Sequence, residues 1–104
     1  FDEVSAKSNG PFIFIIQADH GPGMNVDQTS IENSDVEERL AILNAIYFSD
    51  QKYDALYPSI SPVNTFRVVF SQYFGLDEPV LPDVHYFSLY QTPFDFIPVD
   101  QLLR

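Results

Sequence analysis

An aspartate and a histidine stand side by side at Asp19 and His20, directly after an apolar run, and Gly21 follows them. A carboxylate and an imidazole are both good ligands for Zn²⁺ or Mn²⁺. Gly21 lets the backbone bend, so that the two adjacent side chains can converge on one ion. The pattern predicts a metal-binding turn; the alternative is a surface Asp–His pair that holds nothing.

The apolar run before this pair would position it. Every residue from Phe12 to Ile16 is aromatic or β-branched, which predicts a strand over residues 12–17 that is buried on both faces. Such strands belong to parallel sheets covered by helices, where ligands bind beyond the carboxyl ends of the strands. We therefore expect Asp19 and His20 to be exposed and close together in the loop that follows the strand.

The clearest helix is predicted over residues 62–74. Ser61 and Pro62 form an N-cap followed by proline at the first helical position, and Gly75 is a stop signal. Apolar residues recur between them at helical spacing. We expect one face of this helix to pack on the sheet, and its members are Val63, Phe66, Phe70 and Tyr73.

The remaining segments carry weaker patterns. Residues 1–8 could end a helix, and residues 24–38 are polar and aperiodic, which predicts a long loop. The run 40–48 favours a second buried strand, although Glu37, Glu38 and Arg39 would also suit a helix start. Two short strands are expected at 86–90 and 94–99, joined by a turn at Thr92 and Pro93.

Composition excludes several classes of function. The chain has 104 residues, 45% of them hydrophobic, which is unlike a disordered tail. Fifteen acidic residues against five basic ones give a net charge of −10, which repels nucleic acids and anionic lipid headgroups. Without cysteine, disulfides and thiolate chemistry are excluded. No apolar run reaches the about eighteen residues of a membrane span, and a start at Phe1 suggests a segment of a longer protein.

The segment from Pro11 to Gly21, PFIFIIQADHG, resembles the strand and Asp-His-Gly motif of the alkaline phosphatase and sulfatase superfamily. Three further strings resemble a bacterial branch of sulfatase-like proteins whose members commonly carry membrane helices ahead of an external hydrolase-like domain. These strings are ERLAILNA from Glu38, LYPSISPVNTFR from Leu56, and YFG from Tyr73. The resemblance covers nearly the whole chain from Pro11 onward.

This resemblance implies a fold and a function. It implies an α/β fold with a mixed, mainly parallel sheet and packed helices, in which residues 1–104 form a single segment, the C-terminal piece of an alkaline-phosphatase-like three-layer fold. The parent protein would be a membrane-anchored hydrolase or phosphotransferase acting on phosphate or sulfate esters, with this segment outside the bacterial cytoplasm. The alternative is an α/β binding or scaffolding domain without catalytic activity.

Within the superfamily pattern, Asp19 and His20 match paired ligands of a divalent metal, which could be Zn, Mn, Mg or Ca. The nucleophile and the acidic ligand near it lie far upstream in the family, and no residue here matches a catalytic position. The Cys/Ser-x-Pro-x-Arg signature of sulfatases is also absent. Ser61 and Pro62 do not have its spacing. We therefore expect the segment alone to be inactive and to hold no metal, or only an adventitious ion completed by water or a neighbouring molecule. Its substrate-binding residues stay unknown.

Four other residues can be interpreted either as binding groups or as ordinary surface residues. His85 could be a ligand, but a solvated histidine at a strand edge is favoured because no partner is visible. Arg67 could bind an anion or could pair with a local carboxylate. Glu37 and Glu38 are most simply a solvated acidic turn.

As partners of the segment we expect the rest of the parent domain, no nucleic acid and no direct membrane contact. We also expect self-association through exposed apolar surface.

Overall fold

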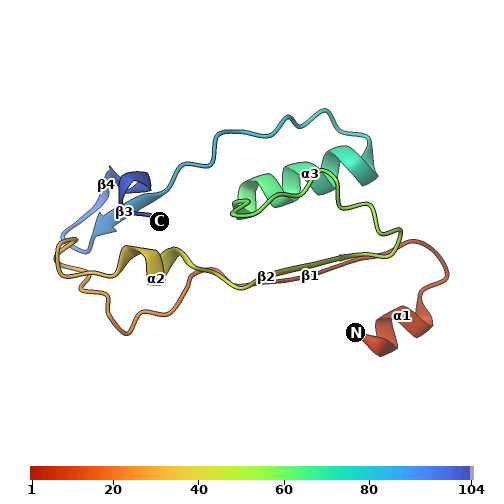
Figure 1. The fold of residues 1–104 in the computed structure, drawn as a ribbon, viewed down its shortest axis with the longest axis horizontal. Helices are drawn as coiled ribbons and strands as arrows, with labels where there is room; N and C mark the ends of the chain where they lie inside the picture. The colour runs from red at the N-terminus through yellow and green to blue at the C-terminus, as the bar shows by residue number, and fades with distance from the viewer. Residues whose placement is uncertain (104) are drawn as a thin grey trace. The chain divides into compact units, whose positions relative to one another are not determined.

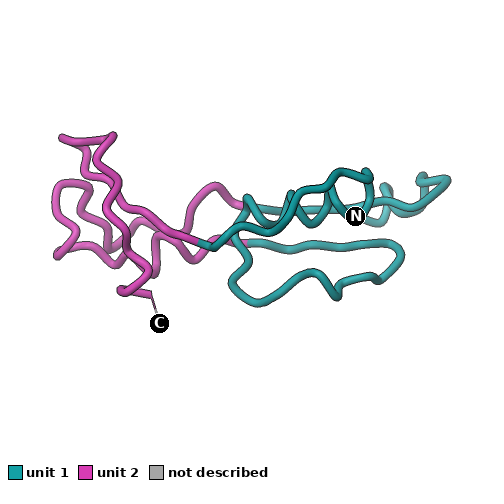
Figure 2. The backbone as a smooth tube through the Cα atoms, turned by 90° about the horizontal axis from the view of Figure 1, so that it is seen from above, with its two compact units in different colours: residues 1–17, 44–83 teal, residues 18–43, 84–104 magenta. Residues whose placement is uncertain are grey.

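The computed structural model describes residues 1–103. Within them lie three α-helices, two separate two-stranded sheets and one 3-10 turn, drawn in Figure 1. The chain divides into two compact units, coloured separately in Figure 2: unit 1 holds residues 1–17 and 44–83, and unit 2 holds residues 18–43 and 84–103. No helix among the described residues is both long enough and apolar enough to cross a membrane.

Unit 1 is built on an antiparallel pair of strands, β1 (Ile13–Gln17) and β2 (Asn44–Phe48). In their register Ile15 lies opposite Ile46, and the ladder continues where Ser49 donates its backbone N–H to the carbonyl of Phe12. The short helix α1 (Asp2–Lys7) precedes β1, and the ring of Phe1 at its start packs on Phe14 and Tyr47. Aromatic contacts thus cover part of one face of the sheet.

The expected mixed, mainly parallel sheet is wrong, and so is the three-layer fold. Both sheets in the described residues are antiparallel pairs, and no strand is flanked on both sides. β1 lies where the apolar run predicted it, but it is not buried on both faces, since Ile16 is 50% exposed and the other positions are half-buried. An unbroken apolar run indicates that a strand favours a buried position. It does not specify how many strands pair with it, or whether they run parallel or antiparallel to it.

Helix α3 (Pro62–Phe74) confirms the predicted helix. The Ser61 hydroxyl accepts from the backbone N–H of Asn64, Pro62 opens the helix, and Gly75 ends it in the left-handed conformation with φ of 67°. The predicted packing face is wrong except at Tyr73, whose ring lies 5.0 Å from that of Phe48. The buried residues of α3 are instead Asn64, Thr65, Val68 and Val69, while Val63, Phe66, Phe70 and Phe74 are exposed.

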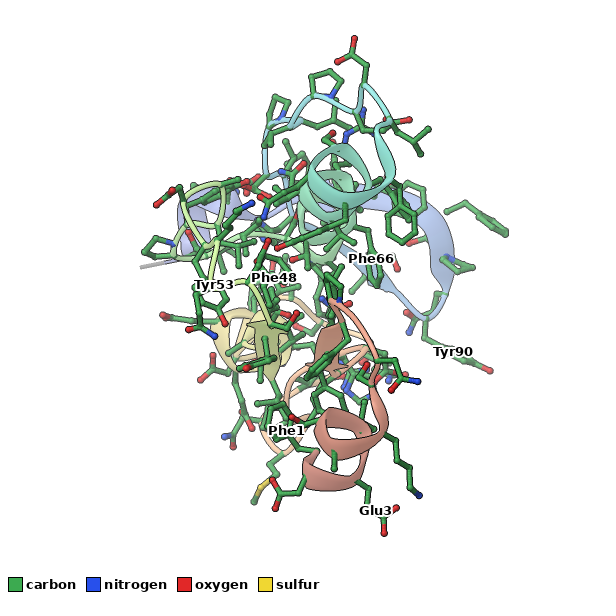
Figure 3. All side chains as sticks on the ribbon, turned by 90° about the vertical axis from the view of Figure 1, so that its right-hand side faces the viewer. Phe1, Glu3, Phe48, Tyr53, Phe66 and Tyr90 are labelled. Atoms are coloured by element: carbon green, nitrogen blue, oxygen red, sulfur yellow. The ribbon has the colours of Figure 1, made fainter. Side chains whose placement is uncertain are left out.

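Phe48 is the centre of the packing in unit 1. It is fully buried, stacks on Tyr53 with ring centroids 5.3 Å apart, and lies next to it in Figure 3, where Phe66 lies apart from both. Thr65 of α3 is also fully buried and accepts a hydrogen bond from Asn44 of β2 at 3.4 Å. The helix therefore meets the sheet through its polar and β-branched side, and its aromatic side is left in solvent.

A buried polar network fixes the loops around the start of α3. Asn64 donates to the carbonyl of Leu81 at 2.7 Å and to the carboxylate of Asp83 at 2.8 Å, and its own oxygen accepts from the N–H of Leu81 at 2.9 Å. Asp83 also accepts from the hydroxyl of Tyr57 and the backbone N–H of Ser61. Every polar atom of this amide has a partner, as burial requires.

Unit 2 contains the short helix α2 (Val36–Leu40), the hairpin of β3 (Tyr86–Leu89) and β4 (Thr92–Pro98), and the 3-10 turn η1 (Asp100–Leu102). Its small core consists of Val36, Phe87 and Val99. The two predicted strands are confirmed, but the turn between them falls at Tyr90 and Gln91, before Thr92. The predicted strand over 40–48 is partly wrong, because Leu40 still belongs to α2 and the strand begins at Asn44.

Candidate functional site

The candidate site of unit 2 is built on the turn that follows β1 and on helix α2. Asp35 caps α2 by accepting a hydrogen bond from the backbone N–H of Glu38 at 2.9 Å, and the helix ends five residues later at Leu40. Gly21 is buried against the last turn of this helix, where its N–H donates to the carbonyl of Arg39 at 2.7 Å. This one backbone contact brings the Asp19–His20 turn to the side chain of Arg39.

Gly21 permits that contact because it has no side chain. A Cβ built at this position would collide with the carbonyl oxygen of Glu38 and would lie 2.8 Å from the carbonyl of Ala41 and 3.0 Å from that of Arg39. All three are backbone atoms, which cannot rotate out of the way. The sequence suggested that Gly21 allows the chain to bend, and the structure shows a different need, which is close approach of two backbones.

Asp19 and His20 lie together at the surface. The carboxylate oxygen Oδ2 of Asp19 is 3.6 Å from Nε2 of His20, and the two side chains are 87% and 50% exposed. Their position in the loop after β1 and their proximity agree with what the sequence predicts. No group of three or more His, Cys, Asp or Glu side chains that could hold a metal occurs within residues 1–103. Asp19 and His20 thus bring together two groups of the kind that bind metals, and the described residues add no third one beside them.

Arg39 completes the cluster, and the sequence interpretation missed it. One guanidinium nitrogen, Nη1, lies 2.7 Å from Nδ1 of His20 and 3.3 Å from the carbonyl oxygen of Gly21. A signal was available, since Asp35 and Glu38 have the spacing of a helix cap and an early acidic residue. A helix starting there places Arg39 in its last turn, near whatever its C-terminal end contacts.

The contacts of His20 define two tautomers with different uses. Guanidinium groups only donate, so a bond from Arg39 requires Nδ1 to accept and places the imidazole proton on Nε2. A hydrogen bond from Nδ1–H to the carbonyl of Gly21, 2.8 Å away, instead requires the proton on Nδ1 and leaves the Nε2 lone pair facing Asp19. The second arrangement is the one found in metal-bound histidines, which donate their other ring N–H to a carbonyl or carboxylate.

A pocket of about 710 Å³ adjoins the cluster. Asp19, His20 and Arg39 supply its acidic and basic side chains. The rest of the lining comes from the loop before α2, from the end of α2 and the residues after it, and from the β3–β4 hairpin. Tyr90, at the hairpin turn, projects outward in Figure 3 and is 77% exposed, while its backbone N–H is held by the carbonyl of Gln28 at 2.8 Å. The pocket thus places the guanidinium of Arg39, the carboxylate of Asp19 and the imidazole of His20 beside apolar side chains.

The other candidates from the sequence are occupied by local partners. Nδ1 of His85 lies 2.8 Å from Oδ1 of Asp100, and this hydrogen bond keeps the pKa of Asp100 below its ordinary value. The interpretation of His85 as a residue without a partner is therefore wrong. Arg67 pairs with Glu78 at 2.9 Å and donates to the carbonyl of Pro79 at 2.6 Å, as its plain interpretation held.

Comparison with known proteins adds no assignment. No protein-family model matches the chain, and neither a curated protein nor a solved structure matches it. The resemblance to sulfatase-like proteins thus stays a prediction from the sequence strings alone.

Proposed function

We propose that this segment supplies two ligands of a divalent metal ion to a hydrolase or phosphotransferase that acts on phosphate or sulfate esters. The observation that carries the proposal is the 3.6 Å separation of Asp19 Oδ2 and His20 Nε2. One ion can bind two atoms at this separation, because Zn²⁺ lies about 2.0–2.2 Å from nitrogen and carboxylate oxygen ligands. Both side chains are exposed, so an ion can reach them.

Each residue of the cluster has a distinct role in this proposal. His20 binds through Nε2 while its Nδ1–H donates to the carbonyl of Gly21, which holds the ring in place. Because Arg39 can only donate, its guanidinium leaves Nδ1 in this tautomer and becomes available to a ligand. Asp19 supplies a charged oxygen, and the guanidinium of Arg39 binds the ester's anionic oxygens, whose geometry it matches. A bound metal would neutralise charge on the transferring group and lower the pKa of a nucleophile.

A binding domain without catalytic activity is the second candidate, and one observation favours it. The described residues offer two donors where catalytic zinc sites use about three protein ligands and one open position. Nothing in the sequence matches a nucleophile either. With aryl phosphate or aryl sulfate we therefore expect no turnover by the segment alone; turnover that disappears on Asp19→Ala would refute this expectation.

Relaxation of inorganic phosphate, measured by ³¹P NMR with Mn²⁺ and the chain, tests the proposal. Phosphate held near a bound Mn²⁺ relaxes faster, so we expect enhancement with wild type, loss with His20→Ala and a clear reduction with Arg39→Ala. Arg67→Ala is the matched control, because that guanidinium is already paired with Glu78. An enhancement that survives His20→Ala, or that falls equally in the Arg67 variant, contradicts the proposal.

A further inference from the structure

The outer edge of β1 in unit 1 has backbone groups that face no other strand. In an antiparallel ladder, alternate residues direct their N–H and C=O groups to the partner strand and away from it. Ser49 donates to the carbonyl of Phe12, so Phe12, Phe14 and Ile16 face β2. The backbone groups of Ile13, Ile15 and Gln17 face outward, and no backbone hydrogen bond to them from outside the ladder occurs among residues 1–103.

One end of the outer edge of β2 is protected in a way that the edge of β1 is not. Its outward residue Phe48 donates its N–H to the hydroxyl of Tyr53 at 3.1 Å. The carbonyl of Phe48 accepts from the backbone N–H of Gln51 at 3.0 Å and from its side-chain amide at 3.2 Å. The loop after β2 thus folds back and closes the Phe48 end of its edge, although Ile46 and Asn44 still face outward. None of the three outward residues of β1 has such a contact among residues 1–103.

β1 also lacks the features by which proteins keep strand edges from pairing. Open edges are normally interrupted by lysine, proline, a bulge or a charge directed inward. The segment IFIIQ has no charged residue and no proline, and its register with β2 is unbroken. Ile16 is 50% exposed although it is apolar. A regular, uncharged and apolar edge of this kind is a template for another strand.

We propose that β1 pairs through this edge with β1 of a second copy of the chain, antiparallel, across a two-fold axis at Ile15. This register uses all three outward residues: Ile15 faces Ile15 of the other copy, and Ile13 faces Gln17. A two-fold contact requires a surface that is complementary to itself, and a short apolar strand edge meets this requirement without any second surface.

The charge distribution favours a second copy at this edge over other parts of the surface. The chain carries a net charge of −10, so two copies repel each other where their acidic residues meet. Residues 11–18 carry no charged side chain, and in this register Asp19 lies opposite Pro11 of the other copy. Pairing therefore puts no like charges face to face. Salt should strengthen it, because it screens the remaining repulsion.

Sedimentation equilibrium and amide hydrogen exchange, measured on the whole chain from about 10 μM to 1 mM, test the pairing. We expect a monomer–dimer equilibrium whose dissociation constant falls several-fold between 0.05 M and 0.5 M salt. The amides of Ile13, Ile15 and Gln17 should exchange more slowly as dimer forms, while those of Phe14 and Ile16 stay protected throughout. A monomer at all concentrations, or a dimer that leaves the three outward amides unchanged, overturns the proposal.

Two matched substitutions separate this edge from the aromatic side of α3, another exposed apolar surface of unit 1. Ile16→Lys puts a charge on β1 as natural edge strands do, and Val63→Lys puts the same charge on α3, where Val63 is 59% exposed. We expect Ile16→Lys to weaken dimerisation at least about tenfold, equivalent to about 1.4 kcal/mol, and Val63→Lys to leave it unchanged. Loss of the dimer in the Val63 variant alone would assign it to α3 and overturn the proposal. Far-UV circular dichroism checks that both variants fold.

Discussion

Two carboxylates, one in each unit, differ in how fully their surroundings satisfy them. Asp83 of unit 1 accepts from Tyr57, Ser61 and the buried amide of Asn64. Burial raises the pKa of Asp83, but hydrogen bonds from these three residues outweigh it and lower that pKa to about 2. Asp19 of unit 2 is 87% exposed, and its carboxylate lies 3.6 Å from the ring of His20, too far for a hydrogen bond of ordinary length.

The difference separates a structural group from a binding group. The network around Asp83 has no capacity left for a ligand, because its donors and acceptors are already paired within the chain. The cluster of Asp19, His20 and Arg39 has spare capacity: an exposed carboxylate, and an imidazole whose Nδ1 has two competing partners. Polar residues that a fold does not need for itself are the ones available to bind something else.

The largest expected effect comes from breaking the satisfied network. Asn64→Ala removes both amide groups and leaves the buried carbonyl and N–H of Leu81 without partners. We expect the free energy of unfolding to fall by about 3 kcal/mol, since each buried polar group without a partner costs about 1–3 kcal/mol. Urea titration followed by circular dichroism measures it. The control Asn9→Ala, at an exposed position, should change it by less than about 0.5 kcal/mol; equal effects would remove the distinction.

A somewhat smaller effect is expected from Gly21→Ala, which probes the backbone contact under the candidate site. The added methyl group would collide with the carbonyl of Glu38, so we expect a loss of about 2 kcal/mol in the stability of unit 2. Gly10→Ala is the matched control, because a Cβ there meets nothing within 4 Å. Hydrogen exchange at the amide of Gly21 reports the contact directly. An unchanged protection factor in the alanine variant would show that the two backbones are not in contact.

A smaller effect should appear in acid. The pKa of Asp83 is about 2 in the folded chain and 3.8 in the reference state, so its ionised form stabilises the fold above about pH 4. That contribution, of order 1 kcal/mol after allowance for solvent screening, is lost as the pH falls from about 4 to 2. Unfolding free energies measured across this range should fall less steeply in Asp83→Asn than in wild type. Parallel curves would show that Asp83 is not the titrating group.

Local signals in the sequence predicted local structure well. Ser61, Pro62 and Gly75 delimit α3 because capping, fixed proline φ and the left-handed glycine are properties of a few adjacent residues. The same holds for β1, and for Asp19 and His20, which adjacency alone keeps close in space.

Non-local features could not be predicted in this way. The partner of β1 begins at Asn44, 27 positions after Gln17, and nothing in either run specifies an antiparallel pair. The aromatic periodicity of α3 pointed to Phe66 and Phe70 as core, but the helix buries Asn64 and Thr65 because their hydrogen bonds lie on that side. Arg39 reaches the site because the last turn of α2 packs against Gly21. This is a contact between backbone segments that are far apart in the sequence.

The central claim, that Asp19 and His20 are a ligand pair, is tested most directly by calorimetric titration with Zn²⁺ and Mn²⁺. Measurements at about 0.15 M salt screen diffuse attraction to the acidic surface. We predict one weakly bound ion per wild-type chain, with water completing its coordination, at least about tenfold weaker binding in Asp19→Ala and His20→Ala, and no change in His85→Ala, whose imidazole is held by Asp100. Absence of binding to wild type, or binding that survives the loss of His20, would contradict the account.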